Sequence, residues 1–194
     1  MSVIRSFIAI DLPDTLNEEL TQVSDALQVK LKGMPIRWVP VPNIHLTLKF
    51  LGDVSERNIV MINEILLAEV TSHKQFEISV GGFGVFPNYR RPRVIWVGVE
   101  APEELHHLHR RIDIETTRLG YAPDQRKFDP HLTFGRVSRN ANPGEVRKIS
   151  SELKQYKLGF LGATRITEVN LFRSDLSPKG AVYSKLYTAQ LGNN

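Results

Sequence analysis

Apolar residues recur along this chain with two periods, and these periods follow one another in the same order twice. Residues 3–10 form a short apolar run that is typical of a buried strand. After Pro13 the apolar positions lie three or four residues apart, which predicts a helix: Leu16, Leu20, Val23 and Leu27. Strand character returns at residues 44–50, and we expect this strand to end at the Gly-Asp pair of residues 52–53.

A second helix and a further strand complete this first cycle. Ser55 is a suitable N-cap, and the apolar positions that follow it again have helical spacing: Ile59, Ile62, Ile65 and Leu66. Strand character resumes at residues 76–80, and the glycine-rich residues 81–84 predict a bulge or a bend. A short strand is also expected at residues 37–39.

The second cycle repeats this order of elements. Residues 93–99 predict a strand, Pro102 begins a helix that Gly120 is suited to end, and Pro130 leads into another strand. The rest of the chain predicts a helix at residues 144–153 and two strands at residues 164–172 and 181–189. A turn at residues 177–180 is expected to join these strands.

The duplicated order predicts an α+β fold with two lobes related by an approximate twofold axis. Each lobe is expected to hold an antiparallel sheet with flanking helices, and we expect residues 1–194 to form one bilobal domain. The strands at residues 44–50 and after Pro130 would then face each other across a central groove. Interfaces between lobes are common places for concave binding sites.

These two central strands carry a repeated tetrapeptide. His-Leu-Thr-Leu at residues 45–48 recurs as His-Leu-Thr-Phe at residues 131–134. Because side chains alternate along a strand, the His and Thr of each copy share one face and the apolar residues share the other. A single histidine in a strand is usually structural, but two copies in matching contexts favour one site built from two halves.

The residues of this repeat suit the cleavage of a phosphodiester. Imidazole titrates near neutral pH, so His45 and His131 can form a pair in which one accepts a proton and the other donates one. The hydroxyls of Thr47 and Thr133 can donate hydrogen bonds to phosphate oxygens. Arg136 can add a charged contact to phosphate, although strict alternation puts it on the face opposite His131. Its role therefore requires a bulge or an early end of the strand.

Composition narrows the class of protein further. The chain has 194 residues, a net charge of +4 and no cysteine, which excludes disulfides, thiolate nucleophiles and Cys-ligated metals. The mild basic excess favours an anionic partner, although it is also common in proteins that bind no nucleic acid. The apolar run at residues 7–10 is too short to span a bilayer, so we expect a cytoplasmic protein without a membrane partner.

Other candidate groups have a structural interpretation as well as a functional one. His109 and Asp113 are four residues apart on a predicted helix, and a solvated helix face is favoured over a metal site. Three arginines in residues 90–93 either contact RNA at the rim of a groove or lie on an exposed loop. Trp38 and Trp96 are expected in the core, and the face of Tyr183 is not determined.

The duplicated motif resembles that of the two-histidine phosphoesterase superfamily. Within it, the chain is similar to the RNA 2′,3′-cyclic phosphodiesterases that were once called 2′-5′ RNA ligases. The resemblance covers most of the chain and includes residues 7–13, 37–40 and 50–52 beside the two motifs.

This resemblance implies metal-independent hydrolysis of an RNA 2′,3′-cyclic phosphate to a 2′-phosphate. It implies that His45 is the proton donor to the departing 3′-oxygen and that His131 is the proton acceptor that activates water. The residues alone do not assign these two roles. The same site would support a weak reverse reaction that forms a 2′-5′ linkage.

The implied partner is RNA, or a nucleotide, that carries a 2′,3′-cyclic phosphate. We expect a monomer with no cofactor, no metal and no obligatory protein partner. Two alternatives stay open at this point: a noncatalytic module that binds nucleotides or RNA, and a hydrolase of small cyclic nucleotides.

Overall fold

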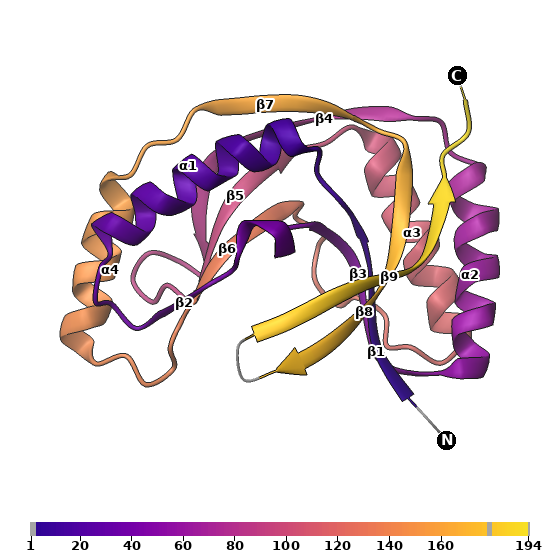
Figure 1. The fold of residues 1–194 in the computed structure, drawn as a ribbon, viewed down its shortest axis with the longest axis horizontal. Helices are drawn as coiled ribbons and strands as arrows, with labels where there is room; N and C mark the ends of the chain where they lie inside the picture. The colour runs from indigo at the N-terminus through magenta and orange to yellow at the C-terminus, as the bar shows by residue number, and fades with distance from the viewer. Residues whose placement is uncertain (1–2, 178–179, 194) are drawn as a thin grey trace.

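The computed structural model describes residues 3–177 and 180–193 of the chain (Figure 1). Its strands are β1 (Val3–Ile10), β2 (Ile36–Trp38), β3 (Leu46–Ser55), β4 (Phe76–Phe86), β5 (Val94–Glu100), β6 (His131–Val137), β7 (Phe160–Ile166), β8 (Glu168–Ser177) and β9 (Gly180–Gln190). Its helices are α1 (Asp14–Lys30), α2 (Glu56–Thr71), α3 (Glu103–Arg118), α4 (Pro143–Gln155) and the 3₁₀ helix η1 (Val41–Asn43).

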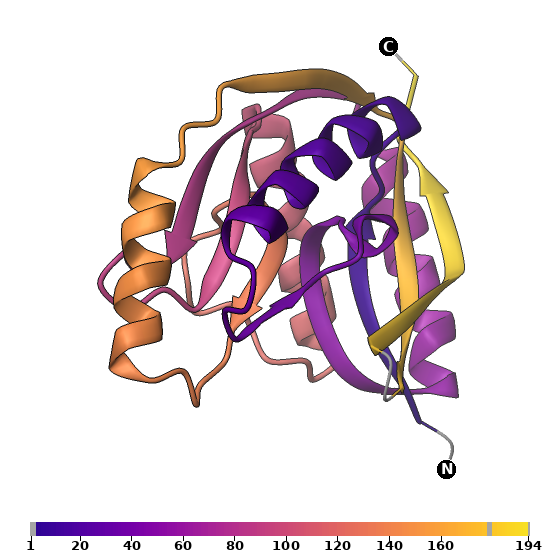
Figure 2. The ribbon, with the colours of Figure 1, turned by 60° about the vertical axis from the view of Figure 1, so that its left-hand side comes forward.

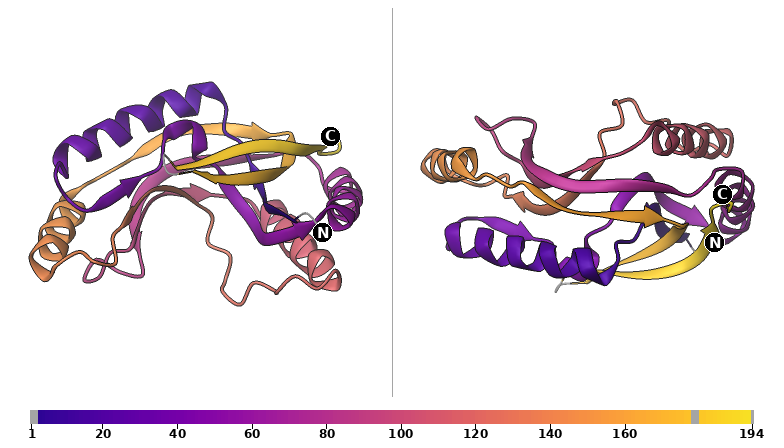
Figure 3. Two further views of the ribbon diagram at one scale, coloured as in Figure 1. Left: turned by 60° about the horizontal axis from the view of Figure 1, so that its bottom comes forward. Right: turned by 90° about the horizontal axis from the view of Figure 1, so that it is seen from above.

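The strands form an antiparallel sheet that is symmetric in its order about the pair β6 and β3. The order is β7-β4-β5-β6-β3-β1-β8-β9, and β2 pairs with β6 beside this path. We call β1, β3, β8 and β9 the β3 half, and β2, β4, β5, β6 and β7 the β6 half. The two halves are inclined to each other, and the sheet is arched (Figure 3). The predicted α+β fold with two lobes and adjacent histidine strands is confirmed.

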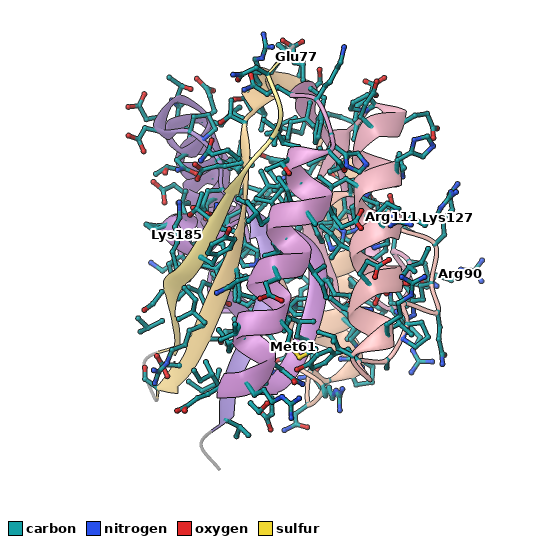
Figure 4. All side chains as sticks on the ribbon, turned by 90° about the vertical axis from the view of Figure 1, so that its right-hand side faces the viewer. Met61, Glu77, Arg90, Arg111, Lys127 and Lys185 are labelled. Atoms are coloured by element: carbon teal, nitrogen blue, oxygen red, sulfur yellow. The ribbon has the colours of Figure 1, made fainter. Side chains whose placement is uncertain are left out.

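Two helices cover each half of the sheet. Helices α2 and α3 lie side by side on the β3 half (Figure 4), and α1 and α4 lie on the β6 half (Figure 2). Helix α1 follows β1 but packs on β7, where Leu16 occupies the space that a side chain at Gly162 would need. Helix α3 follows β5 but packs against α2 and β3. Each half is therefore covered in part by a helix from the other cycle, which ties the halves together.

The helix boundaries follow the signals in the sequence. The Ser55 side chain accepts a hydrogen bond from the Asn58 amide and caps α2. Helix α3 begins directly after Pro102, and Gly120 lies just beyond its end with a φ of 95° that glycine adopts without strain.

Two strand boundaries were predicted wrongly. The strand expected to end at residues 52–53 continues to Ser55, because Gly52 takes a φ of 72° beside a bulge in the pairing of β1 with β3. Likewise β4 continues through the glycine-rich stretch to Phe86, with the predicted bulge at Gly82.

The strand predicted at residues 164–172 is in fact two strands. Strand β7 pairs with β4 in the β6 half, and β8 pairs with β1 in the β3 half, with only Thr167 between them. The chain passes from one half to the other without a loop, so the sequence shows no break. The turn predicted at residues 177–180 includes residues 178–179, which lie outside the described residues.

The main hydrophobic core lies between the helices and the sheet, and a second, smaller cluster is separate from it. Phe7, Ala9 and Phe172 form this second cluster, with Tyr183 packed against it. Among the described residues, no helix combines the length and the apolar character that crossing a membrane requires.

Candidate active site

The pairing of β3 with β6 brings the two tetrapeptides together. Leu46 and Leu132 are the paired residues, and both are fully buried. In an antiparallel pair, one step along each strand aligns His45 with Thr133 and, on the other side, Thr47 with His131. Directly opposed residues share a face of the sheet, so all four polar side chains lie on one face.

Both imidazoles are held by the same backbone contact. Nδ1 of His45 donates to the Asn43 carbonyl at 2.9 Å, and Nδ1 of His131 donates to the Asp129 carbonyl at 2.7 Å. A carbonyl oxygen only accepts, so the proton of each neutral ring is placed on Nδ1. No protein partner of either Nε2 is found within residues 3–177 and 180–193. Each Nε2 can therefore accept a proton from a ligand, or donate one when the ring is protonated.

Aromatic rings surround His45. The ring of Phe7 stacks on the imidazole with centroids 4.6 Å apart, and Tyr183 meets it edge-on at 5.3 Å. Phe172 lies at 6.2 Å. Burial among these rings lowers the pKa of His45, against smaller opposing effects of the Asn43 carbonyl and the Asp11 charge. Tyr183, whose face the sequence left undetermined, thus lies beside this histidine.

Two aromatic rings also lie beside His131. Phe86 meets the imidazole edge-on at 5.0 Å, and Trp96 lies at 6.2 Å. The Trp96 ring covers Gly84, where an added Cβ would come within 2.1 Å of it. The prediction that Trp96 belongs to the core was wrong, since its ring is half-buried beside the histidine. Trp38 is half-buried too, and it packs against the main core.

The two threonines keep their hydroxyls available. Thr47 and Thr133 are half-buried, and neither hydroxyl has a hydrogen-bond partner among the described residues. A half-buried hydroxyl without a partner is suited to bind a ligand oxygen.

A bulge places Arg136 on the face that carries the histidines. Trp96 pairs with Thr133 and Ile95 with Gly135, so β6 has one residue more than β5 between these pairs. The extra residue shifts the alternation, and Arg136 pairs with Val94 on the face of Thr133. The sequence required a bulge or an early strand end for Arg136 to reach phosphate, and this bulge is present. The side chain of Arg136 is exposed.

The comparison with protein families matches the duplicated architecture. The model of the LigT-like phosphoesterases matches residues 10–96 and again residues 97–183. The chain belongs to this family. The boundary between the two matches falls within β5, the first strand of the second cycle, and each match contains one His-x-Thr motif.

Related proteins align with nearly the whole chain. A protein of Methanothermobacter thermautotrophicus named RNA 2′,3′-cyclic phosphodiesterase is 37% identical over 188 residues, which cover 97% of this chain and 99% of the relative. A Thermotoga maritima protein of the same name is 32% identical, with 96% of this chain and 95% of the relative covered.

Solved structures share the fold. A Thermus thermophilus protein gives a TM-score of 0.78 at 26% identity, with 98% of this chain and 100% of the other covered. Escherichia coli LigT in complex with 3′-AMP gives a TM-score of 0.77 at 24% identity, with 98% and 99% covered, and supports the fold alone.

A buried polar network behind the site was missed by the sequence reasoning. Lys49 is 2% exposed on the other face of β3, where its Nζ contacts the Asp113 carboxylate, the Ala122 carbonyl at 2.7 Å and Asp124 at 3.2 Å. The Nε2 of His109 lies 3.3 Å from the Asp124 carboxylate. No signal in the sequence could reveal this network, because strict alternation puts Lys49 on the face of Thr47, whereas a bulge in the pairing of β1 with β3 turns it to the other face.

This network corrects the interpretation of the α3 histidine. His109 and Asp113 do not form a solvated helix face, because His109 is buried and stacks on Phe128 at 3.9 Å. Burial lowers the pKa of His109 against the opposing effect of Asp124. The described residues contain no group of three or more His, Cys, Asp or Glu that could hold a metal ion.

Proposed function

We propose that this protein hydrolyses RNA 2′,3′-cyclic phosphate ends to 2′-phosphates by acid–base catalysis at two histidines. The observation that carries the proposal is the matched pair of imidazoles, each with Nδ1 held by a carbonyl and with Nε2 free of any partner among the described residues. Relatives named RNA 2′,3′-cyclic phosphodiesterase, at 28–37% identity, support the substrate.

In the proposed reaction, water attacks the phosphorus and the bond to the 3′-oxygen breaks. Nε2 of His131 takes the proton of the water, and protonated His45 delivers its Nε2 proton to the departing 3′-oxygen. The phosphate stays on the 2′-oxygen. The hydroxyls of Thr47 and Thr133 and the guanidinium of Arg136 would bind the non-bridging oxygens, whose charge grows in the transition state.

The lowered pKa of His45 bears on these roles. Burial favours the neutral ring in the free protein, whereas a proton donor must be charged. An anionic phosphate beside the ring favours the charged form, so we expect substrate binding to raise the pKa of His45. The donor role therefore depends on the bound substrate.

A substrate with sulfur in place of the 3′-oxygen separates the two roles, because a thiolate leaves without prior protonation. If His45 is the donor, His45→Ala recovers most of its activity on this substrate and His131→Ala does not. Recovery by His131→Ala alone would reverse the assignment.

The function itself is tested by incubating the protein in chelator with an oligoribonucleotide that ends in a 2′,3′-cyclic phosphate. Mass spectrometry and phosphatase mapping then locate the phosphate. We expect a 2′-phosphate. Binding of the RNA without turnover would refute the proposal and favour a noncatalytic module, and turnover of small cyclic nucleotides alone would change the substrate class.

The proposal also covers the domain organisation, the oligomeric state and the location of the protein. We take residues 1–194 as one bilobal unit, because each half contributes one His-x-Thr motif, at the start of β3 and at the start of β6. A monomer without an obligatory protein partner, a cytoplasmic location and a weak reverse ligation stay predictions.

A further inference from the structure

A groove lined by arginines lies at the far end of β6 from His131. Its volume is about 910 Å³, and four of its ten lining residues are arginines: Arg37, Arg93, Arg136 and Arg139. The other six residues include no carboxylate: Met34, Pro35, Ile36, Val94, Val137 and Ser138. The groove is therefore a concentrated positive site.

One face of β5 connects this groove with the candidate active site. Gly98 pairs with His131, Trp96 pairs with Thr133, and Val94, which lines the groove, pairs with Arg136. These three β5 residues alternate on a single face. The four residue steps from Gly98 to Val94, at a rise of about 3.3 Å each, place the Arg136 backbone about 13 Å along the strand from that of His131. That span corresponds to a few nucleotides of an extended strand. A side chain as long as arginine can reach back from there toward the reacting phosphate, while the rest of the groove lies beyond it.

The arginines of this groove form no ion pair with any of the described residues. Arg93 donates to the Ser138 carbonyl at 2.7 Å, whereas the side chains of Arg37, Arg136 and Arg139 have no partner within residues 3–177 and 180–193. The β3 half differs in this respect. There Lys185 pairs with Asp11 at 2.7 Å.

The three arginines at residues 90–93 lie in different parts of the surface. Arg93 lines the groove, whereas Arg90 lines another hollow of about 540 Å³ beside α4 and points away from the ribbon (Figure 4). Arg91 is exposed and lines neither hollow.

We propose that the arginine groove binds backbone phosphates of the RNA on the 5′ side of the terminal cyclic phosphate. This inference rests on the proposed function. A 2′,3′-cyclic phosphate ends the RNA, so the rest of the strand leaves the histidines in one direction only. Guanidinium groups without protein partners match phosphate oxygens in geometry and charge. The preferred substrates are therefore oligoribonucleotides rather than cyclic mononucleotides.

The test compares kcat/KM for 2′,3′-cyclic AMP with kcat/KM for a hexaribonucleotide that ends in a cyclic phosphate. The variant is the double substitution Arg37→Gln and Arg139→Gln, which spares Arg136 and the Arg93 hydrogen bond. Arg110→Gln is the matched control, since Arg110 is an exposed arginine of α3 whose side chain has no partner among the described residues. Thermal unfolding checks that all variants fold.

We expect wild type and control to prefer the hexanucleotide. The double variant should lose about tenfold on it, from two charge-assisted contacts, and keep its rate on 2′,3′-cyclic AMP. The slope of log kcat/KM against log salt should fall by about 1.4 for the hexanucleotide, from two single-strand phosphate contacts. An equal loss on both substrates, or no loss on either, would overturn the inference.

A binding measurement separates this inference from the proposed function. Fluorescence anisotropy gives the Kd of a labelled hexaribonucleotide for wild type, double variant and control, whether or not turnover occurs. Weaker binding by the double variant alone supports the groove even if no cyclic phosphate is hydrolysed. Equal binding by all three proteins overturns the groove even if hydrolysis is confirmed.

Discussion

The two histidines have the same motif and the same backbone contact, but different surroundings. Phe7, Phe172 and Tyr183 enclose His45, whereas Phe86 and Trp96 stand beside His131. A pair with matched geometry and unequal environments is suited to opposite roles in proton transfer, and burial lowers the pKa of His45.

The pKa of His45 provides a direct prediction. In an NMR titration of the free protein, the chemical shift of the Cε1 proton of His45 should report a pKa below the ordinary histidine value of 6.5. Opening the site with Phe7→Ala should move the midpoint upward, because water then reaches the imidazolium. Phe86→Ala is the control, because the ring of Phe86 lies against Trp96 and His131. A midpoint above 6.5 in wild type would contradict the burial argument.

The same shift affects stability with a defined sign. Because the folded-state pKa of His45 is lowered, the unfolded chain binds the proton first as the pH falls. His45 therefore contributes to a free energy of unfolding that rises with pH, from its folded-state pKa up to about 6.5.

The role of Arg136 gives a second prediction at this scale. Arg136→Gln should lower kcat/KM by about 10- to 100-fold, the range for losing a charge-assisted hydrogen bond to phosphate. Arg136→Lys should recover only part of the rate, since lysine lacks the planar fork. A rate equal to that of Arg110→Gln would show that Arg136 does not contact the phosphate.

At the scale of elements, the buried network joins the two motifs from behind. Lys49 lies two residues after Thr47, and its partners belong to α3 and to the loop that leads to His131. Asp124 in this loop also donates its backbone amide to Asp113 at 3.1 Å. The network thus holds the approach to His131 against β3.

Lys49→Met should destabilise the protein strongly. It removes the cation from between two carboxylates, Asp113 and Asp124, and breaking a buried pair in this way costs about 3 kcal/mol. Urea denaturation measures the loss, with the exposed Lys127→Met as control. A change of less than about 1 kcal/mol would place the pair in the range of surface ion pairs.

The elements also show what the sequence could predict. Helix ends were predictable because caps such as Ser55 act locally. The strand end expected at Gly52 was wrong, because a glycine with positive φ can form a bulge as well as a turn. The bulge that turns Arg136 toward the site lies in the pairing of β5 with β6, and an effect of pairing is not visible in one strand alone.

At the scale of the whole molecule, the active site depends on the junction of two halves. The duplicated motif predicted that junction, but it did not predict that β3 and β6 meet through the single pair of Leu46 and Leu132. Nor did it predict the exchange of α1 and α3 between the halves. These features fix how the two histidines face each other, and they arise from packing between distant parts of the chain.

The central claim is that the two histidines act as one catalytic unit. The most direct measurement is the single-turnover rate of His45→Ala, His131→Ala and the double variant on a cyclic-phosphate RNA in chelator, with Kd measured alongside. Each single variant should lose about 10²–10⁴-fold with little change in Kd. The double variant should lose much less than the product of both, since groups that act as a unit are not additive. Losses that multiply fully, or that appear in Kd alone, would contradict the account.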